Sequence, residues 1–396
     1  MTTRSPGSLI EKGVPAKARV KSFSGELWSS AQRKGCAIHE ISYRACFKPQ
    51  VPKFFIDRYT EPGDIVYDPF MGRGTSVIEA ILSGRKAIGN DVNPLSRMLT
   101  EPRLDVPAIE SVVERLESID FTKVLKADID LSMFYHPRTV RELLALRKYL
   151  GDREKADEGD KIDRWIRMIA TNRLTGHSPG FFSVYTLPPN QAASQEDQRR
   201  INRIRKQKPE YRNVRDLILK KTRRVLSALD DVQREKLSDA LDQVMLLTGD
   251  ARSTPDIMSN TVQLTVTSPP FLDIVDYAKD NWLRCWFNKI SLESVERKLT
   301  RTRTVAQWTV VMHDVFRELY RITKPGGHVA FEVGEVRKNT IKLDDVIIPV
   351  GESAGFDPLN VFINVQRFTK TAHIWGVRNN INGTNTNRIV LFQKKR

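Results

Sequence analysis

One stretch of the sequence, residues 65–91, constrains the fold more than any other. It begins with a short apolar run that leads into a turn containing Gly72 and Gly74, and an apolar stretch with helical periodicity follows over residues 77–82. A second strand is predicted over residues 86–91. The order strand, glycine turn, helix, strand is that of a βαβ unit with parallel strands, so the sequence predicts an α/β core.

A long segment interrupts this core. Residues 120–243 are helical by composition, are broken by glycine and proline, and show no clear strand alternation. The α/β pattern then resumes, with strands expected over 244–248, 262–267 and 329–333, helices over 282–289 and 305–323, and a closing antiparallel pair over 361–368 and 389–393. The predicted organisation is a flexible arm (1–24), the first part of the core (25–119), an inserted domain (120–243) and the second part of the core (244–396).

The charge balance favours a polyanionic partner. The 396 residues include 64 Lys and Arg against 48 Asp and Glu, a formal net charge of +16. Half of this excess lies between Glu196 and Arg224, where twelve basic residues stand against four acidic ones. Nucleic acid is therefore the first candidate partner.

Several kinds of site are disfavoured by the sequence. Cys36, Cys46 and Cys285 are scattered without a CxxC pair, and the histidines form no pair at metal-ligand spacing, so we expect neither a disulfide framework nor a metal site. No apolar run is long enough to span a membrane, and residues 1–21 lack the apolar middle of a secretory signal. The sequence predicts a cytoplasmic protein with no membrane partner.

The glycine turn predicts a ligand that approaches the backbone closely. Glycine has no side chain and tolerates positive φ, so Gly72 and Gly74 leave room at the end of a strand. The pattern is neither the GxGxxG of dinucleotide binders nor a P-loop. Asp91 ends the second strand, where a carboxylate in this fold accepts hydrogen bonds from ribose hydroxyls, which fits an adenosine-containing cofactor.

A second motif, residues 267–271, follows a predicted strand directly and reads Thr-Ser-Pro-Pro-Phe. Two consecutive prolines fix two φ angles, so the carbonyls of Ser268 and Pro269 are held rigidly beside the serine hydroxyl. Phe271 offers a flat apolar face, which complements a planar base taken out of a stack. The alternative is a plain stiffened loop, which is how we interpret Pro188 and Pro189.

These motifs together resemble those of amino-group DNA methyltransferases. Residues 68–75 resemble the cofactor-binding motif of that family, and residues 267–271 resemble its catalytic motif in the serine form. Residues 47–59 resemble the segment that closes over the methionine end of the cofactor, residues 91–94 the ribose-binding motif, and residues 249–252 the turn whose acid contacts adenine. About half of the chain, roughly 45–106 and 244–394, is covered.

The resemblance implies a doubly wound, Rossmann-like methyltransferase sheet and S-adenosyl-L-methionine as the cofactor. It implies cofactor-binding roles for Lys48, Pro49, Asp68, Pro69, Phe70, Gly72, Gly74, Thr75, Asp91, Asn93, Asp250 and Ala251. It implies catalytic roles for Ser268, Pro269, Pro270 and Phe271.

In the family, the serine form of the motif is usual for N4-cytosine enzymes, and forms with Asp or Asn are usual for N6-adenine enzymes. Ser268 therefore favours cytosine N4 as the target. Adenine N6 is the alternative, and an RNA base is a third, less favoured target. Hydrogen bonds from the amine to the Ser268 hydroxyl and the Pro269 carbonyl would make the nitrogen more nucleophilic, without a covalent adduct. A DNA-binding regulator with an inactive core is the competing class, which the intact motifs disfavour.

The insertion is the predicted target-recognition domain for double-stranded DNA, and a cognate restriction endonuclease is a further expected partner. The basic residues Arg199, Arg200, Arg203, Arg205, Lys206 and Lys208 are expected to contact phosphates, the alternative being a solvated helix face. Candidate base contacts are Asn172, Arg173, His177, Tyr185 and Asn190.

Other residues near the motifs receive secondary interpretations. Asp273, Asp276 and Tyr277 are candidates to line the pocket. Trp282, Trp286 and Phe287 are expected to pack their helix onto the sheet rather than to stack on a base. Arg73, which replaces a frequent serine of the family, is expected to face solvent or DNA phosphate.

Overall fold

The computed structural model describes residues 20–25, 36–43, 46, 48–188, 191–238, 240–270, 277–299, 302, 304–336, 341–365 and 386–396. The strands are β1 (Lys21–Gly25), β2 (Ile65–Asp68), β3 (Lys86–Asn90), β4 (Val244–Leu247), β5 (Val262–Thr267), β6 (Thr323–Val333), β7 (Glu335–Val336), β8 (Ile341–Lys342), β9 (Phe356–Val365) and β10 (Thr386–Lys394). The helices are α1 (Gln50–Tyr59), α2 (Thr75–Leu82), α3 (Pro94–Thr100), α4 (Ile109–Ser118), α5 (Pro137–Lys155), α6 (Lys161–Arg173), α7 (Gln195–Arg205), α8 (Val214–Leu226), α9 (Asp231–Ser238), α10 (Tyr277–Phe287), α11 (Leu292–Lys298), α12 (Val305–Ile322) and α13 (Leu343–Ser353).

Eight strands form one sheet in the order β1-β9-β10-β6-β5-β2-β3-β4. From β6 to β4 the strands are parallel, and β10 is antiparallel to both β6 and β9. The chain winds outward from β2 in both directions, first through β3 to β4 and later through β5 to β6. This doubly wound order confirms the predicted fold class and places a topological switch point between β2 and β5, where ligands bind in such sheets.

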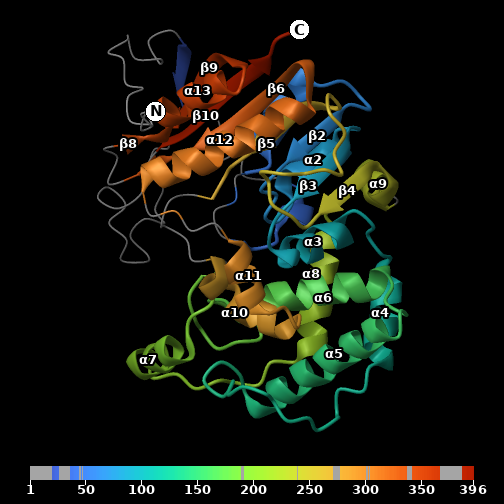
Figure 1. The fold of residues 1–396 in the computed structure, drawn as a ribbon. Coiled ribbons are helices and arrows are strands. Elements are labelled where there is room, and N and C mark those ends of the chain that lie inside the picture. Colours follow the sequence, from blue (N-terminus) through green and yellow to red (C-terminus); the bar gives the residue numbers. More distant parts are fainter. Residues whose placement is uncertain are drawn as a thin grey trace, which may run out of the picture.

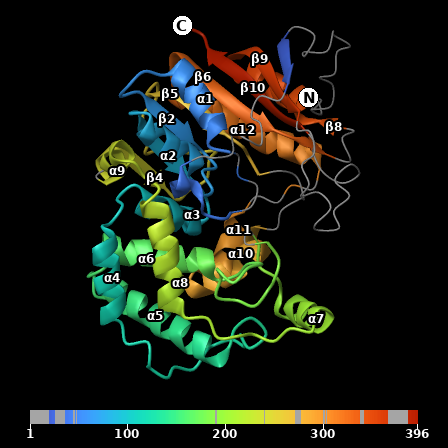
Figure 2. The same cartoon turned by 180° about the vertical axis from the view of Figure 1, so that it is seen from behind.

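Helices cover both faces of the sheet (Figures 1 and 2). On one face, α1 contacts α2, β5 and β6, and Val66 and Val266 belong to the core beneath them. On the other face, α12 and α13 pack together, and Tyr67 and Phe331 lie under them. Five of the six residues of β5 are buried, the exception being Gln263, as expected of a parallel strand covered on both sides.

The helices α4, α5, α6 and α8 pack against one another below the sheet in Figure 1. Although α10 and α11 follow β5 in the chain, α10 contacts α6 of this helical region. Trp282 lies 5.9 Å from the Phe134 ring, and its indole donates to Ala193 O, while Trp286 donates to Asp128. The prediction that these tryptophans pack onto the sheet is therefore wrong, because their indole N–H groups find partners in the helical region.

The edge strand β1 occupies the end of the range predicted as a flexible arm, residues 21–24, and one residue beyond it. Lys21 pairs with Asn360 and Gly25 with Asn364 in a parallel ladder with β9. The arm prediction therefore does not hold for residues 21–24, whose exposed side chains gave no apolar period although their backbone joins the sheet. Residues 1–19 lie outside the described residues. Within the described part of the chain, no helix is both long and apolar enough to cross a membrane.

Candidate functional site

The two predicted motifs meet at the carboxyl edge of the sheet. Strands β2 and β5 are parallel neighbours, with Val66 opposite Leu264 and Tyr67 opposite Thr265. The glycine turn follows β2, and Ser268 follows β5, so both leave the sheet at the same edge. The structure therefore brings together two motifs that stand roughly 190 residues apart in the sequence.

Asp68 ties these two motifs to each other. Its Oδ1 accepts hydrogen bonds from the Thr267 hydroxyl (2.7 Å) and from Phe70 N (3.1 Å), and its Oδ2 accepts from the Ser76 hydroxyl (2.7 Å). Burial raises the pKa of Asp68 to about 6, although these hydrogen bonds favour the charged form. The carboxylate thus lies beneath the turn and fixes the residue before Ser268.

The glycine turn requires glycine at its second position. Gly74 has φ +72°, and a Cβ there would lie 2.4 Å from the side chain of buried Thr100. Gly72 has φ +50°, and its N–H donates to Asp91 Oδ2 at 2.9 Å. Thr75, the first residue of α2, is buried and accepts from Arg73 Nε. The turn is held open by backbone geometry that other residues rarely adopt.

Asp91 and Asn93 lie beside this turn. The second oxygen of Asp91 accepts from Asn93 N at 2.9 Å, and Asn93 caps α3 by accepting from Leu95 N. Burial raises the pKa of Asp91, and backbone hydrogen bonds from Asn93 and Gly72 oppose this. Each oxygen of Asp91 has one backbone donor, so lone pairs remain for hydroxyl donors of a ligand.

The turn after β4 is joined to the same edge by a residue that the sequence analysis missed. Asn90 is fully buried, accepts from Gly249 N and donates to Gly249 O, both at 3.0 Å. Asp250 follows and pairs with Arg252, and Ala251 is buried. The signal in the sequence that could have identified Asn90 is an amide side chain at the end of a predicted apolar strand.

Arg73 is half-buried and its guanidinium binds backbone carbonyls, which neither expectation for this residue included. Its guanidinium donates to His39 O (3.2 Å) and Ile41 O (2.9 Å), so it holds the chain segment 36–43 against the glycine turn. Fully buried Arg103 donates to Ile38 O and Arg73 O, and burial lowers its pKa to about 9. Carbonyl groups of a segment distant in sequence provide these partners, which no local pattern could reveal.

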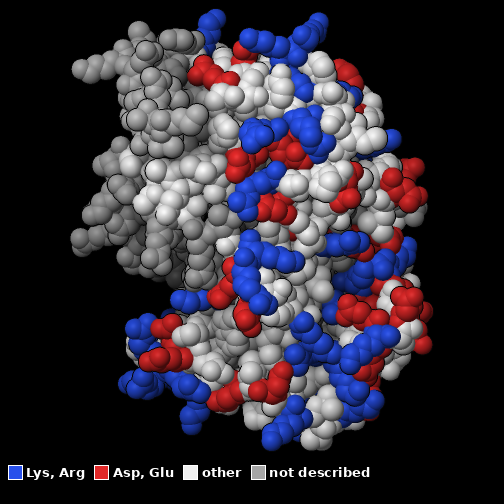
Figure 3. Space-filling view, in the orientation of Figure 1, with Lys and Arg blue, Asp and Glu red and all other residues white. Residues whose placement is uncertain are grey.

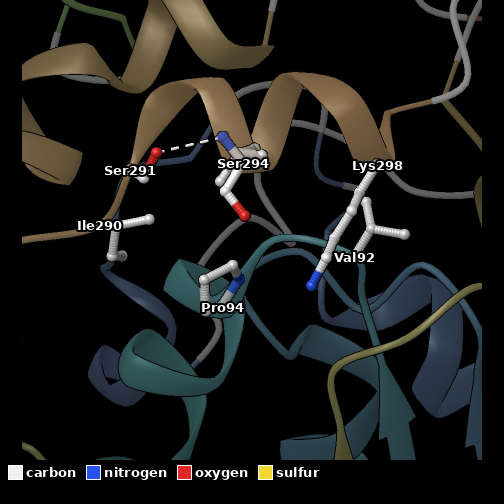
Figure 4. Close-up of a pocket in the computed structure, with 7 residues that line it drawn as sticks. Val92, Pro94, Ile290, Ser291, Ser294 and Lys298 are labelled. Carbon is white, nitrogen blue, oxygen red and sulfur yellow. Dashed lines mark hydrogen bonds between the residues drawn. The ribbon is translucent and has the colours of Figure 1, made fainter.

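A cavity of about 230 Å³ opens next to the ribose motif. Val92 lines it from the loop after β3 and Pro94 from the start of α3, and on the other side it is lined from α11 and the loop before it by Ile290, Ser291, Ser294, Val295 and Lys298. Figure 4 shows the Lys298 side chain running from α11 toward the loop that carries Val92. A segment that follows the catalytic motif therefore faces the loop beyond Asp91.

The end of the catalytic motif is anchored to the opposite face of the sheet. The indole of Trp308, which is buried in α12, donates to Pro270 O at 3.2 Å. Ser268 is half-buried and Pro269 is buried. The predicted residues Phe271, Asp273 and Asp276 lie outside the described residues, as does the side chain of Tyr277.

The predicted base contacts of the helical region divide by burial. Asn172 is 1% exposed, and burial lowers the pKa of Arg173 to about 10, with its guanidinium over the Phe181 ring. Asn172 packs in the interior, so the structure contradicts its assignment to base contacts, whereas Arg173 is half-buried. The ring of Tyr185 lies under Arg205 at 3.6 Å. Asn190 lies outside the described residues.

The predicted phosphate contacts gather on and after α7. This helix stands at the edge of the helical region, and Figure 3 shows Lys and Arg side chains there with acidic ones between them. Arg199 pairs with Asp130 and Arg200 with Asp197, both in exposed ion pairs. The other predicted phosphate contacts are Arg203, Arg205, Lys206 and Lys208. This set, with Arg199 and Arg200, is called the α7 basic cluster below.

The predicted cofactor residues ahead of the turn lie at the start of α1. Lys48 and Pro49 precede this helix, and Phe70 follows Asp68 and Pro69 in the turn. His39 and Glu79, which were not singled out from sequence, form a buried pair at 2.7 Å. Within the described residues no group of three metal-ligating side chains is brought together.

Comparison with known proteins finds DNA methyltransferases among the similar sequences. Residues 12–96 match the N6/N4 methyltransferase family model, which is described as DNA methylase. The chain is 20% identical to the Type II methyltransferase M.BsoBI of Geobacillus stearothermophilus, over 90% of this chain and 86% of that protein. It is 29% identical to the Type II methyltransferase M.MjaII of Methanocaldococcus jannaschii over 126 residues, which are 32% of this chain and 20% of that protein.

A solved structure of a DNA modification methylase aligns over about a third of the chain. A putative DNA modification methylase from Thermus thermophilus, complexed with S-adenosyl-L-methionine, is 23% identical with a TM-score of 0.23. The alignment covers 37% of this chain and 52% of that one, so the chain spans about half the length of that structure.

Proposed function

The chain belongs to the N6/N4 amino-group DNA methyltransferases, and from this premise we propose that it methylates the exocyclic N4 amine of cytosine in DNA, with S-adenosyl-L-methionine as the methyl donor. The observation that carries the proposal is the position of Ser268. It leaves β5 beside the glycine turn of β2, and Asp68 binds the residue before it. The residues proposed for the cofactor and those proposed for the amine would therefore act at one switch point.

The residues of the carboxyl edge fit the cofactor. The positive φ at Gly72 and Gly74 lets a ligand approach the backbone of the turn, and Asp91 keeps lone pairs for ribose hydroxyls. The hydrogen bonds between Asn90 and Gly249 hold the turn of Asp250 next to that position. When bound, S-adenosyl-L-methionine supplies an electrophilic methyl group on its sulfonium.

The chain would orient and activate the amine through the catalytic motif. The lone pair of an exocyclic amine is delocalised into the ring, and acceptors at its two protons favour a more tetrahedral nitrogen. The Ser268 hydroxyl and the Pro269 carbonyl would be these acceptors. Trp308 holds Pro270 and thereby limits movement of the motif, which keeps the acceptors in place before the base arrives.

The preference for cytosine rests on Ser268, because the serine form resembles that of N4-cytosine enzymes. The second candidate is N6-adenine, since both families share the core and the chemistry of an exocyclic amine. An RNA base is a third and weaker candidate. Each substrate presents the same amine chemistry to Ser268, so only product analysis separates them.

Double-stranded DNA is the proposed substrate, with the target base flipped into the pocket. The helical region would recognise the sequence around the target, and the α7 basic cluster would contact phosphates. Relatives named Type II methyltransferases support modification of a defined site. By the same reasoning a cognate restriction endonuclease is a proposed partner.

The test is product analysis. DNA is incubated with the protein and methyl-labelled S-adenosyl-L-methionine, digested to nucleosides and analysed by mass spectrometry. Labelled N4-methylcytosine is expected, and we expect Ser268→Ala to reduce its rate of formation on the order of a hundredfold. Ser353→Ala is the matched control, because its hydroxyl donates only to Val350 O at the end of α13, away from the motifs.

Three outcomes contradict the proposal at different levels. Labelled N6-methyladenine would replace cytosine by adenine and leave the site intact. Label in RNA but not in DNA would replace the substrate class. Full activity of Ser268→Ala would remove the catalytic motif from the mechanism.

A further inference from the structure

A buried acid at the end of β6 has no role in the function described so far. Glu332 is 5% exposed, and its Oε2 has no hydrogen-bond partner among the described residues. Burial raises the pKa of Glu332 to about 7, against the hydrogen bond of Asn387 and the charge of Lys48. An acid in this state destabilises a fold, so its presence calls for a ligand.

The strand register places Glu332 next to Ser268. In the parallel pair of β5 and β6, Thr267 lies opposite Phe331, so the next residues of the two strands are Ser268 and Glu332. Neighbouring strands are about 4.8 Å apart. A small group in contact with the Ser268 hydroxyl is therefore within reach of the Glu332 carboxyl.

Side-chain alternation assigns both residues to the same face. Val266 and Ala330 lie in the core cluster beneath α1 and α2, and two residues further along each strand come Ser268 and Glu332. On β10 the register partner of Glu332 is Ile389, which belongs to the same cluster.

The charged surroundings of Glu332 are sparse. Among the described residues, the charge that acts on it is Lys48, from the segment before α1, and Asn387 of β10 provides a neutral hydrogen bond. His328 lies on the same strand and face four residues earlier, against the Tyr59 ring. No described neighbour forms a hydrogen bond with Oε2 of Glu332. This oxygen can therefore accept a hydrogen bond from a donor that arrives with the substrate.

We propose that Glu332 is a catalytic residue of this methyltransferase, which contacts the target amine held at Ser268 and accepts the proton that the amine releases. This inference rests on the proposed function of the site. The new N–C bond forms from the nitrogen lone pair while the S–C bond breaks, with its electron pair going to sulfur. The methylated nitrogen is then positively charged, and loss of its proton to the Glu332 carboxylate leaves a neutral amine and a neutral acid.

The test is the rate of methyl transfer in a single turnover at saturating S-adenosyl-L-methionine, measured across pH. For the full chain, the rate should rise with pH through the titration of Glu332, because only the carboxylate accepts a proton. Glu332→Gln should lower the rate on the order of a hundredfold and remove this rise. The control Glu352→Gln changes an exposed acid of α13 and should alter neither.

Two further readouts separate catalysis from structure. Cofactor affinity, measured by titration without DNA, should stay within about twofold in Glu332→Gln. The Tm of this variant at neutral pH should not fall, because it removes a charge whose burial is unfavourable. A merely structural acid would lower the Tm and leave the pH profile of the remaining folded enzyme unchanged.

Unchanged rate and pH profile in Glu332→Gln would overturn the inference. So would a loss of cofactor affinity with full methyl transfer at saturation, because the acid would then serve the cofactor. If Glu332→Gln does not fold, Glu332→Asp is the variant to test. Its shorter side chain moves the carboxylate away from the amine, so methyl transfer should be slower and its pH profile should shift. A wild-type rate and pH profile in Glu332→Asp would contradict the proposal. A wild-type protein that methylates no nucleic acid would refute the proposed function itself.

Discussion

The glycine turn and the α7 basic cluster carry the two sets of residues that the sequence singled out, yet they are built differently. At the turn, buried polar groups bind partners far away in sequence, as Asp68 does with Thr267 199 residues later. On α7, exposed cations pair with acids on the surface, as Arg199 does with Asp130. Binding at the turn is therefore coupled to folding, whereas binding at α7 can be changed without affecting the fold.

The largest effect that tests this contrast is expected from Gly74→Ala. A left-handed conformation is unfavourable for alanine by about 1–2 kcal/mol, and overpacking against Thr100 adds roughly 1–3 kcal/mol. We expect the free energy of unfolding to fall by about 2–5 kcal/mol, with loss of cofactor binding. Denaturant unfolding and a cofactor titration measure the two.

Gly84→Ala is the matched control for this change. Gly84 has φ +75°, but nothing lies within 4 Å of the position of a Cβ. In Gly84→Ala the free energy of unfolding should fall only by the cost of the left-handed conformation, about 1–2 kcal/mol, and cofactor binding should be normal. Equal losses in the two variants would show that close packing at Thr100 contributes nothing.

A smaller effect is expected from Glu318 on α12, which anchors the turn after β4. It accepts from Thr254 N and Oγ1 and pairs with Arg321. Although burial opposes it, these hydrogen bonds lower the pKa of Glu318 to about 2 from an ordinary value near 4.5. Since the folded pKa is the lower one, the stabilisation is present above pH 4.5 and is lost as pH falls toward 2.

The free energy of unfolding near pH 6 should therefore be higher for the wild type than for Glu318→Gln, by at most about 3 kcal/mol. Solvent screening at partly exposed Arg321 makes the actual difference smaller than this limit. The difference should shrink between pH 5 and 2. Taking this difference removes the opposite contributions of Asp68 and Glu332, whose pKa values are raised. A difference that does not depend on pH would contradict the assignment.

The parts of the site that the sequence predicted are those whose local pattern sets their position. The run of a buried strand, a glycine turn and an amphipathic helix placed Gly72, Gly74 and Asp91 correctly at the carboxyl edge, since these elements are neighbours in sequence. The strand before Ser268 was predicted for the same reason. The βαβ pattern likewise predicted the parallel core.

The parts that the sequence did not predict depend on contacts between distant segments. Arg73 was assigned to solvent or phosphate because carbonyl partners such as Ile41 O carry no side-chain signature. The role of Asn90 depends on a turn that follows the whole insertion. Trp282 resembles a sheet-facing residue in its helical spacing, and only the tertiary placement of α10 shows that it packs against Phe134.

The smallest effect on stability is expected at the α7 basic cluster. Replacing Arg203, Lys206 and Lys208 by Gln should change the free energy of unfolding by less than about 0.5 kcal/mol, because surface cations contribute little to folding. Affinity for double-stranded DNA should fall, and the slope of log K against log salt should decrease by about 2–3. Electrophoretic mobility shift across a salt series measures this slope.

The matched control replaces three cations at the opposite edge of the sheet. Lys324 near the start of β6, together with Lys395 and Arg396 after β10, lies at the amino edge, away from the switch point. The same change of charge there should leave the salt slope nearly unaltered. Equal slopes in the two triple variants would mean that net charge alone determines binding, and the difference between the two regions would then be one of stability rather than of function.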